Sequence, residues 1–243
     1  MGVGGGIFLV PLLLVFSNYA IEQIVGLVAF CLFCSSSIAS FMNYRNHNVD
    51  YRFALIFEAP SVVGAFLGVL VLSLVDQDIV KIIFVIYLSY VVIGLGKNHK
   101  TFFNYKKLGL IGPQIKTHSN ERFGLALITC FGLFAGAVAG LLGVGGGIIK
   151  TPFMTKALGF SLKNAAATSV FMIAITSLAA VLAHILNGNF VIGENFGVII
   201  GFCLGGLLGP RLREAIDPVH NLKLLRVMIV FAIIIIVHEV VSA

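Results

Sequence analysis

The sequence predicts an all-α, polytopic bundle of transmembrane helices. Of its 243 residues, 59% are hydrophobic and only 11% are charged, whereas a soluble domain carries roughly 25% charged residues. Several apolar stretches approach the roughly 20 residues that a helix needs to cross a bilayer. Because these stretches are continuously apolar rather than alternating, helices are favoured over a β-barrel.

The apolar segments form two groups on either side of a polar, basic stretch. One short and three long segments come first, at 5–17, 20–42, 53–74 and 79–96. The second group lies at 123–142, 146–158 (short), 161–186, 192–213 and 221–241. We therefore divide the chain into a first transmembrane repeat, a basic cytoplasmic linker and a second transmembrane repeat, at residues 1–96, 97–121 and 122–243.

A repeated hexapeptide relates the two groups. Gly-Val-Gly-Gly-Gly-Ile stands at 2–7 and again at 143–148, an offset of 141 residues. The same offset places Pro11 on Pro152 and Ser36 on Ser177. A glycine-rich hexamer and a proline in one register predict an internal repeat.

Basic residues predict that the two repeats have opposite orientations in the membrane. The linker carries Lys97, Lys100 and Lys106 among others, which places it on the cytoplasmic side. Basic residues of the second half correspond to uncharged or acidic residues of the first: Lys156, Lys163, Arg211, Arg213, Lys223 and Arg226 align with Val15, Glu22, Leu70, Leu72, Ile82 and Val85. Opposite charge bias in equivalent loops is typical of inverted-topology repeats.

The second half has an apolar segment before its glycine motif, at 123–142, whereas only Met1 precedes Gly2. The repeat therefore predicts that the first helix of repeat 1 is missing.

Each glycine motif predicts a helix hairpin broken inside the membrane. Glycine-rich sequence weakens a helix, and the apolar segment that follows is too short to span. Transporters place substrate at such breaks, although glycines also serve close helix packing. The expected substrate-binding residues of the two breaks are Gly4, Gly5, Gly6, Pro11, Gly145, Gly146, Gly147 and Pro152.

Lys150, close to the second break, is a candidate partner for an anionic substrate, with snorkelling to the membrane surface as the equal alternative. Four hydroxyls in the long segments are further candidates, with interhelical hydrogen bonding as the alternative: Ser36, Thr168, Ser169 and Ser177. Glu58 and His184 could relay a proton coupled to transport, although Glu58 lies near a segment end, where snorkelling is also expected.

Other functions are disfavoured. The formal charge of +6 is explained by membrane orientation, so we expect no nucleic-acid partner. The four cysteines lie in apolar runs and lack His or further Cys at metal spacing. No catalytic triad, metal-ligand set or paired carboxylates stand out, so we expect no enzyme, no metal and no cofactor.

The duplicated Gly-x-Gly-Gly-Gly-x4-Pro, from Gly2 to Pro11 and from Gly143 to Pro152, resembles that of the sulfite exporter TauE/SafE family. The stretches 158–169 and 205–211 also fit. The resemblance implies a multi-pass permease of the cytoplasmic membrane that moves sulfite, organosulfonates or related small anions on an ion gradient. Its partners would be a small-molecule anion and the lipid bilayer. An anion channel of the same architecture and a non-transporting membrane scaffold are the alternatives.

Overall fold

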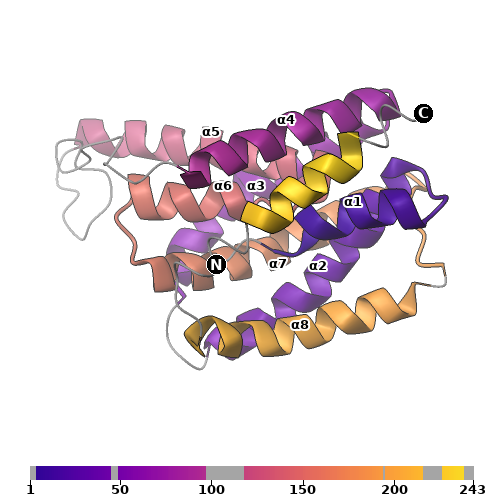
Figure 1. Cartoon of the computed structure of the whole chain (residues 1–243). Coiled ribbons are helices and arrows are strands. Elements are labelled where there is room, and N and C mark those ends of the chain that lie inside the picture. Colours follow the sequence, from indigo (N-terminus) through magenta and orange to yellow (C-terminus); the bar gives the residue numbers. More distant parts are fainter. Residues whose placement is uncertain (1–3, 45–48, 97–117, 194, 216–225, 238–243) are drawn as a thin grey trace.

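The computed structural model describes residues 4–44, 49–96, 118–193, 195–215 and 226–237. Within these ranges every regular element is a helix, which confirms the all-α class (Figure 1). The elements are α1 (Gly6–Phe16), α2 (Ile21–Tyr44), α3 (Tyr51–Leu72), α4 (Gln77–Gly96), α5 (His118–Leu142), α6 (Gly147–Pro152), the π-helix Phe153–Ala157, α7 (Leu162–Leu186), α8 (Phe196–Ala215) and a last helix, Arg226–Val237.

Helix starts follow local sequence chemistry. The Asp50 side chain accepts a hydrogen bond from the backbone N–H of Phe53 at 3.0 Å, and Ser161 does the same for Asn164 at 3.2 Å. These caps satisfy backbone donors that the first turn leaves free, and they begin α3 and α7. At the start of α6, Gly146 has a φ of 68°, a left-handed conformation that favours glycine.

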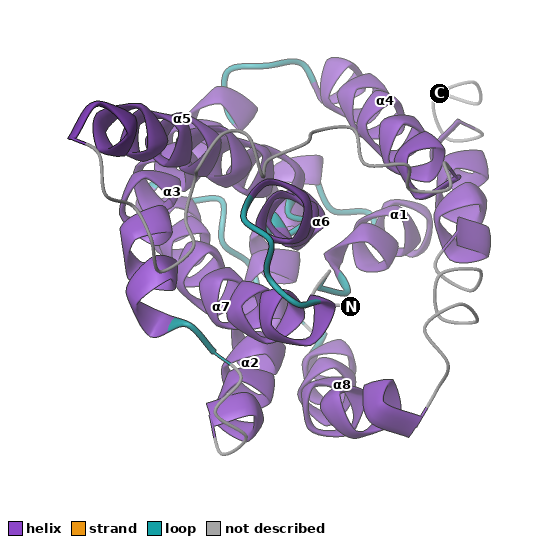
Figure 2. Cartoon of the chain, turned by 90° about the vertical axis from the view of Figure 1, so that its left-hand side faces the viewer, coloured by secondary structure: helices purple, strands orange, loops and turns teal. Residues whose placement is uncertain are grey.

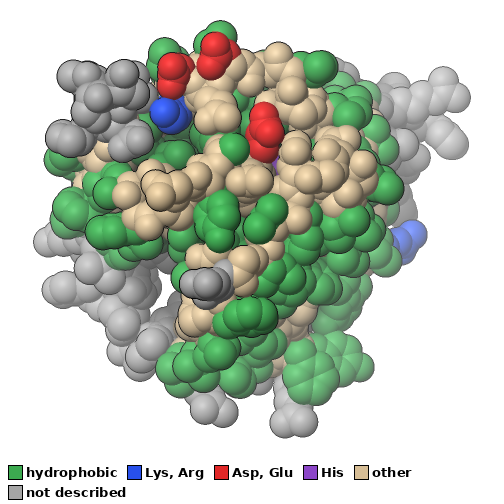
Figure 3. Space-filling view, turned by 90° about the vertical axis from the view of Figure 1, so that its right-hand side faces the viewer, with side chains coloured by type: hydrophobic (Ala, Val, Ile, Leu, Met, Phe, Trp, Pro, Cys, Tyr) green, Lys and Arg blue, Asp and Glu red, His purple; other side chains and the backbone are tan. Residues whose placement is uncertain are grey.

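Three of the described helices are long and apolar enough to cross a membrane: Ile21–Tyr44, Tyr51–Leu72 and Lys163–Leu186. Large apolar side chains are also exposed on the outside of the bundle, as at Leu74 (85%) and Leu186 (78%). Figure 3 shows one end of the molecule, where apolar side chains cover much of the surface and most of the charged ones lie near the top of the view. Such a surface suits lipid.

Glycines bring α3 and α5 into backbone contact. A Cβ placed on Gly64 or Gly68 would collide with the carbonyl oxygens of Leu133 and Ala137 on α5. In return, Gly136 lies against the Ser61 carbonyl. Packing this close is typical of small-residue interfaces between membrane helices.

The equivalent glycines of α8 behave differently. Gly205 and Gly209 have nothing within 4 Å of an added Cβ among the described residues. Gly64 and Gly68 therefore form a packed face on α3, whereas the equivalent pair on α8 forms none in the part of the chain that the structure describes.

In an end-on view, α6 lies near the middle of the bundle, with α3, α5 and α7 on one side and α1 on another (Figure 2). A buried cluster that includes Phe57, Met154 and Met172 joins α3, the π-helix and α7. A larger cluster joins α1, α2, α4 and the last helix. This arrangement places the second glycine break inside the protein.

Loops from different parts of the chain meet at the two ends of the bundle. A cleft of about 350 Å³ between α1 and α4 is lined by Tyr19 and Gln77, among others, and a Cβ on Gly193 would meet the Tyr19 hydroxyl. Elsewhere, the backbone N–H of Asp50 donates to the Thr168 hydroxyl at 3.1 Å. The segments before α3 and at the start of α7 are therefore neighbours.

The domain division and the missing helix stay predictions. Residues 97–117 of the expected linker lie outside the described residues, and α5 begins at His118, inside the range given to the linker. Lys223, one of the charges that predict orientation, lies outside them too.

Candidate functional site

The two glycine breaks lie against each other. A Cβ on Gly6 would collide with the Gly143 carbonyl and lie 3.2 Å from the Val144 Cα. A Cβ on Gly4 would lie 3.6 Å from the Val144 carbonyl oxygen. Each break leads into a short helical stretch, α1 with 11 residues in one half and α6 with its following π-helix in the other. Backbone from both halves therefore meets at one place in the bundle.

Two apolar side chains close over the breaks. Leu32 on α2 and Ile173 on α7 are 1% exposed, and both border Gly4 and Gly145. A Cβ on Gly145 would lie 3.0 Å from Ile173 Cγ2 and 3.2 Å from Leu32 Cδ1. Gly4 and Gly145 also have φ angles of 70° and 74°, which disfavour any side chain there.

The second break carries a buried ion pair. The Lys150 ammonium on α6 lies 2.5 Å from Oε1 of Glu58 on α3, and the two residues are 0% and 1% exposed. The snorkelling alternative is therefore wrong for both residues. Removing two charges from water costs several kcal/mol per ion unless pairing and hydrogen bonds offset it. A pair held at this depth among apolar helices is a functional candidate.

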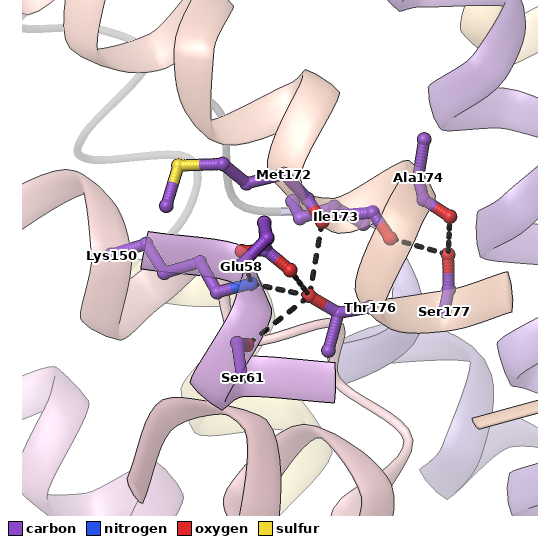
Figure 4. Close-up of polar contacts among 8 residues, drawn as sticks. All are labelled: Glu58, Ser61, Lys150, Met172, Ile173, Ala174, Thr176 and Ser177. Atoms are coloured by element: carbon purple, nitrogen blue, oxygen red, sulfur yellow. Dashed lines mark hydrogen bonds and ion pairs between the residues drawn. The ribbon is translucent and has the colours of Figure 1, made fainter. Parts of the chain in front are cut away.

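A threonine on α7 connects the two charges (Figure 4). Lys150 donates to the Thr176 hydroxyl at 2.5 Å, and that hydroxyl donates to Oε2 of Glu58. Its oxygen also lies 3.0 Å from the Met172 carbonyl and 3.4 Å from the Ser61 hydroxyl on α3. Because a hydroxyl has one proton, it can donate to the carboxylate or to the carbonyl at any moment, but not to both.

A small void adjoins this network. It is too narrow to admit a water molecule. It is lined by Ala29, Leu32, Ala139, Gly143, Gly145, Thr176, Ser177 and Ala180. Thr176 thus belongs both to the ion-pair network and to the closed space beside the glycine breaks.

Sequence comparison shows the family of this chain. The sequence model described as "Sulfite exporter TauE/SafE" matches residues 1–238. The chain belongs to the sulfite exporter TauE/SafE family.

Similar proteins are described as probable membrane transporters. The chain is 26% identical to a probable membrane transporter protein of Methanocaldococcus jannaschii, covering 94% of this chain and 84% of the relative. It is 25% identical to the probable membrane transporter protein YunE of Bacillus subtilis, covering 95% and 88%. A probable membrane transporter protein of Haemophilus influenzae is 25% identical, covering 94% and 86%. No solved structure matches. These findings support a membrane transporter.

Other residues expected at the site of this TauE/SafE protein lie near the breaks or the helix ends. The hydroxyls of Ser36 and Ser177 donate to the carbonyls of Leu32 and Ile173, each at 2.5 Å. Thr168 is buried, and its hydroxyl accepts a hydrogen bond from the backbone N–H of Asp50, just before α3. This contact joins Thr168 to the start of α3 rather than to Lys150. Ser169, also on α7, is fully buried.

The two prolines are placed differently. Pro11 is buried inside α1. Pro152 is exposed and closes α6, where the helix widens into π geometry. Pro152 cannot donate the backbone hydrogen bond of a regular turn, which accounts for a helix irregularity here.

His184 is not part of the ion-pair network. Its side chain is fully buried, and both ring nitrogens lack hydrogen-bond partners among the described residues. It packs beside Gly26, where an added Cβ would lie 3.2 Å from the imidazole Cγ. Its role in proton relay stays a prediction, whereas Glu58 is placed directly against Lys150.

Thr176 and Ser61 were absent from the expected site. Ser61 follows Glu58 by three residues on α3, so both lie on one helix face; that spacing was the available signal. Nothing in the sequence indicates that α3, α6 and α7 converge. Within the described residues, no group of three or more His, Cys, Asp or Glu side chains could hold a metal ion.

Proposed function

We propose that this chain is a secondary transporter that moves a small anion, such as sulfite or an organosulfonate, across the cytoplasmic membrane. One observation carries the proposal: a fully buried lysine ammonium at a glycine break inside a bundle of apolar helices. In such surroundings a positive charge strongly attracts an anion that reaches it. The family membership supports transport as the role of this charge.

The substrate site in this proposal lies between the two glycine breaks. Lys150 supplies the charge, Thr176 and Ser177 supply hydroxyls beside the void, and the glycines let backbone approach a ligand closely. Because the void is too narrow for water, substrate entry in this proposal requires Leu32 and Ile173 to separate. A closed centre of this kind favours alternating access over an open channel.

We also propose that the two halves are inverted repeats that together form this site. Equivalent residues under the offset of 141 make equivalent contacts: Leu32 and Ile173 both cover Gly4 and Gly145. Ser36 and Ser177 then bond the carbonyls of that same pair. Reporter fusions at residues 76–78 and 187–189 should report the outside, and fusions in the linker the cytoplasm. Any other pattern would reject the inverted arrangement.

Flux through purified protein in liposomes tests the function. We expect saturable uptake of sulfite, in a panel that also includes sulfoacetate and thiosulfate, with protein-free liposomes as the control. If none of a broad anion panel shows saturable uptake, the proposal is wrong. Flux that never saturates and ignores pH would instead indicate a channel. A cellular phenotype that survives substitution of Lys150 and of Gly145–Gly147 would favour a scaffold.

A further inference from the structure

We propose that Glu58 and the transported anion alternate as the partner of the Lys150 ammonium, and that Glu58 takes up one proton each time the anion binds. The protein would then carry one singly charged oxyanion together with one proton. This inference rests on the proposed function and adds the coupling mechanism and the charge of the substrate.

An anion that binds the Lys150 ammonium competes with Glu58 for it. The Lys150 ammonium already donates to Glu58 and to Thr176, each at 2.5 Å, and the Phe57 ring centroid lies 6.0 Å from the nitrogen. An ammonium has three donors. The two contacts use two of these donors, and an anion at the third, with Glu58 still in place, would put two negative charges against one ammonium in an apolar interior, which is costly. We therefore infer that the anion replaces the Glu58 carboxylate.

Charge balance explains why a proton accompanies the anion. The empty site is neutral, because one ammonium faces one carboxylate. The site with the anion alone holds a net charge of −1, and the site with the proton alone holds +1; each leaves an unpaired charge in a dry, apolar interior, which is costly. With anion and proton both bound, the site is neutral again. Only the empty and the doubly loaded states can therefore be closed and reoriented at low cost.

Thr176 provides the switch between the two partners. Its hydroxyl now accepts from Lys150 and donates to Glu58, while its side chain also lines the void. Once Glu58 is protonated, the carboxyl group becomes a donor and the hydroxyl can accept from it. The hydroxyl proton is then free to turn toward an anion in the void. Thr176 is thus a positioning residue for the exchange.

No other charge contacts the pair among the described residues of the helices around it. Glu58 and Ser61 face it from α3, Lys150 from α6 and Thr176 from α7. From α5, Ala135 and Gly136 supply backbone and small side chains there. The nearest titratable group along α7, His184, lies eight residues beyond Thr176, about 12 Å along the helix axis. Along α3 the nearest charge is Arg52, which is exposed and lies six residues before Glu58. Asp50, the N-cap of α3, accepts from the backbone N–H of Phe53 instead.

The charge balance also selects the substrate. A singly charged oxyanion, such as a hydrogensulfite or an alkylsulfonate, replaces the carboxylate one for one. A doubly charged anion would leave the loaded site negative after a single protonation. The inference therefore assigns a monoanion with sulfonate-like oxygens as the substrate class.

The test uses liposomes that contain the full chain and radiolabelled methanesulfonate, whose charge stays −1 throughout the usable pH range. Two quantities are measured: exchange of labelled for unlabelled anion without a gradient, and net accumulation driven by an acidic outside. One proton per monoanion predicts an accumulation ratio of about tenfold for each pH unit, unaffected by membrane potential. Glu58→Gln should retain exchange but lose accumulation, because its empty site is charged. The matched control Glu22→Gln, a carboxylate on α2 outside the network, should behave as wild type.

Several results would overturn the inference. Wild-type exchange that a pH gradient cannot drive, or Glu58→Gln protein that still accumulates the anion, rules out proton coupling through this carboxyl while leaving the proposed function intact. Accumulation of thiosulfate, which carries two negative charges, to the same level as methanesulfonate rules out the monoanion class. Absence of exchange for every anion rejects the proposed function and the inference with it. Should Glu58→Gln fail to fold, two other measurements still test proton coupling. The wild-type protein should accumulate the anion in response to the pH gradient, and Glu58→Asp should keep that response.

Discussion

Lys150 and Glu58 are 92 residues apart in the sequence and form a fully buried ion pair of 2.5 Å between α6 and α3. Each charge exists at this depth because the other one faces it. The pair links a helix that follows the second glycine break to a helix of the first half. It therefore ties the state of the candidate substrate site to contacts between the two halves.

Breaking the pair from one side should cost more stability than removing both charges. Lys150→Met leaves a buried carboxyl without its cation, and removal of one partner typically costs about 3–5 kcal/mol. The double variant Lys150→Met/Glu58→Gln should recover most of this loss, because no unpaired charge remains. Thermal unfolding in detergent of the wild type, the single variant and the double variant measures this loss of stability. Equal melting temperatures for the single and double variants would show that the pair is not coupled in this way.

Replacing the Thr176 hydroxyl by a methyl group should disturb both charges at once. Thr176→Val keeps the shape of the side chain but leaves an ammonium and a carboxylate each short of one partner, at a cost of about 1–3 kcal/mol. We expect lower stability and transport slowed by about tenfold or more, since 1.4 kcal/mol corresponds to a factor of ten.

Thr176→Ser, which restores the hydroxyl, should recover most of both properties. Ser73→Ala, at the exposed end of α3, serves as the control outside the site. Transport by Thr176→Val at the wild-type rate would show that the Thr176 hydroxyl takes no part in transport.

Leu32 and Ile173 should act as the closure over the glycine breaks. Truncating either to alanine enlarges the void at a cost of about 2–5 kcal/mol in stability. It should also let small anions leak through the protein without saturation. Flux at high anion concentration, compared between Leu32→Ala and wild type, measures the leak. A variant that is destabilised yet shows no added flux would mean that these side chains only fill space.

The α3–α5 interface should tolerate no side chain at its glycines. Gly64→Ala forces a Cβ into the Leu133 carbonyl, so the helices must separate, and over-packing of this kind costs about 1–3 kcal/mol. Gly205→Ala, at the equivalent place on α8, meets open space and should be nearly neutral. Comparative melting in detergent checks the difference, and similar losses for both variants would contradict it.

The sequence was sufficient for the helices and for part of the site. Long apolar runs predicted each spanning helix to within a few residues, because hydrophobic length in a membrane leaves few alternatives. Lys150 and Glu58 were both identified, since ionisable residues in apolar segments are rare enough to be noticed. The glycine motifs marked where the two halves meet.

The sequence could not show that Lys150 and Glu58 pair with each other. That contact depends on how α6 packs between α3 and α7, which follows from tertiary packing across 92 residues rather than from local pattern. For the same reason Thr176, an ordinary hydroxyl among several on α7, did not stand out. Thr168, by contrast, was expected at the site because of its residue type, and its hydroxyl instead accepts from the backbone of Asp50 at the start of α3.

The most direct test is a structure of the protein with a bound heavy monoanion, such as a selenium-containing sulfonate analogue located by anomalous scattering. We expect the anion within about 3 Å of the Lys150 ammonium, beside Thr176 and between the glycine breaks, with the Glu58 carboxyl turned away. An anion bound elsewhere in the bundle, with the Lys150–Glu58 pair still intact, would contradict it.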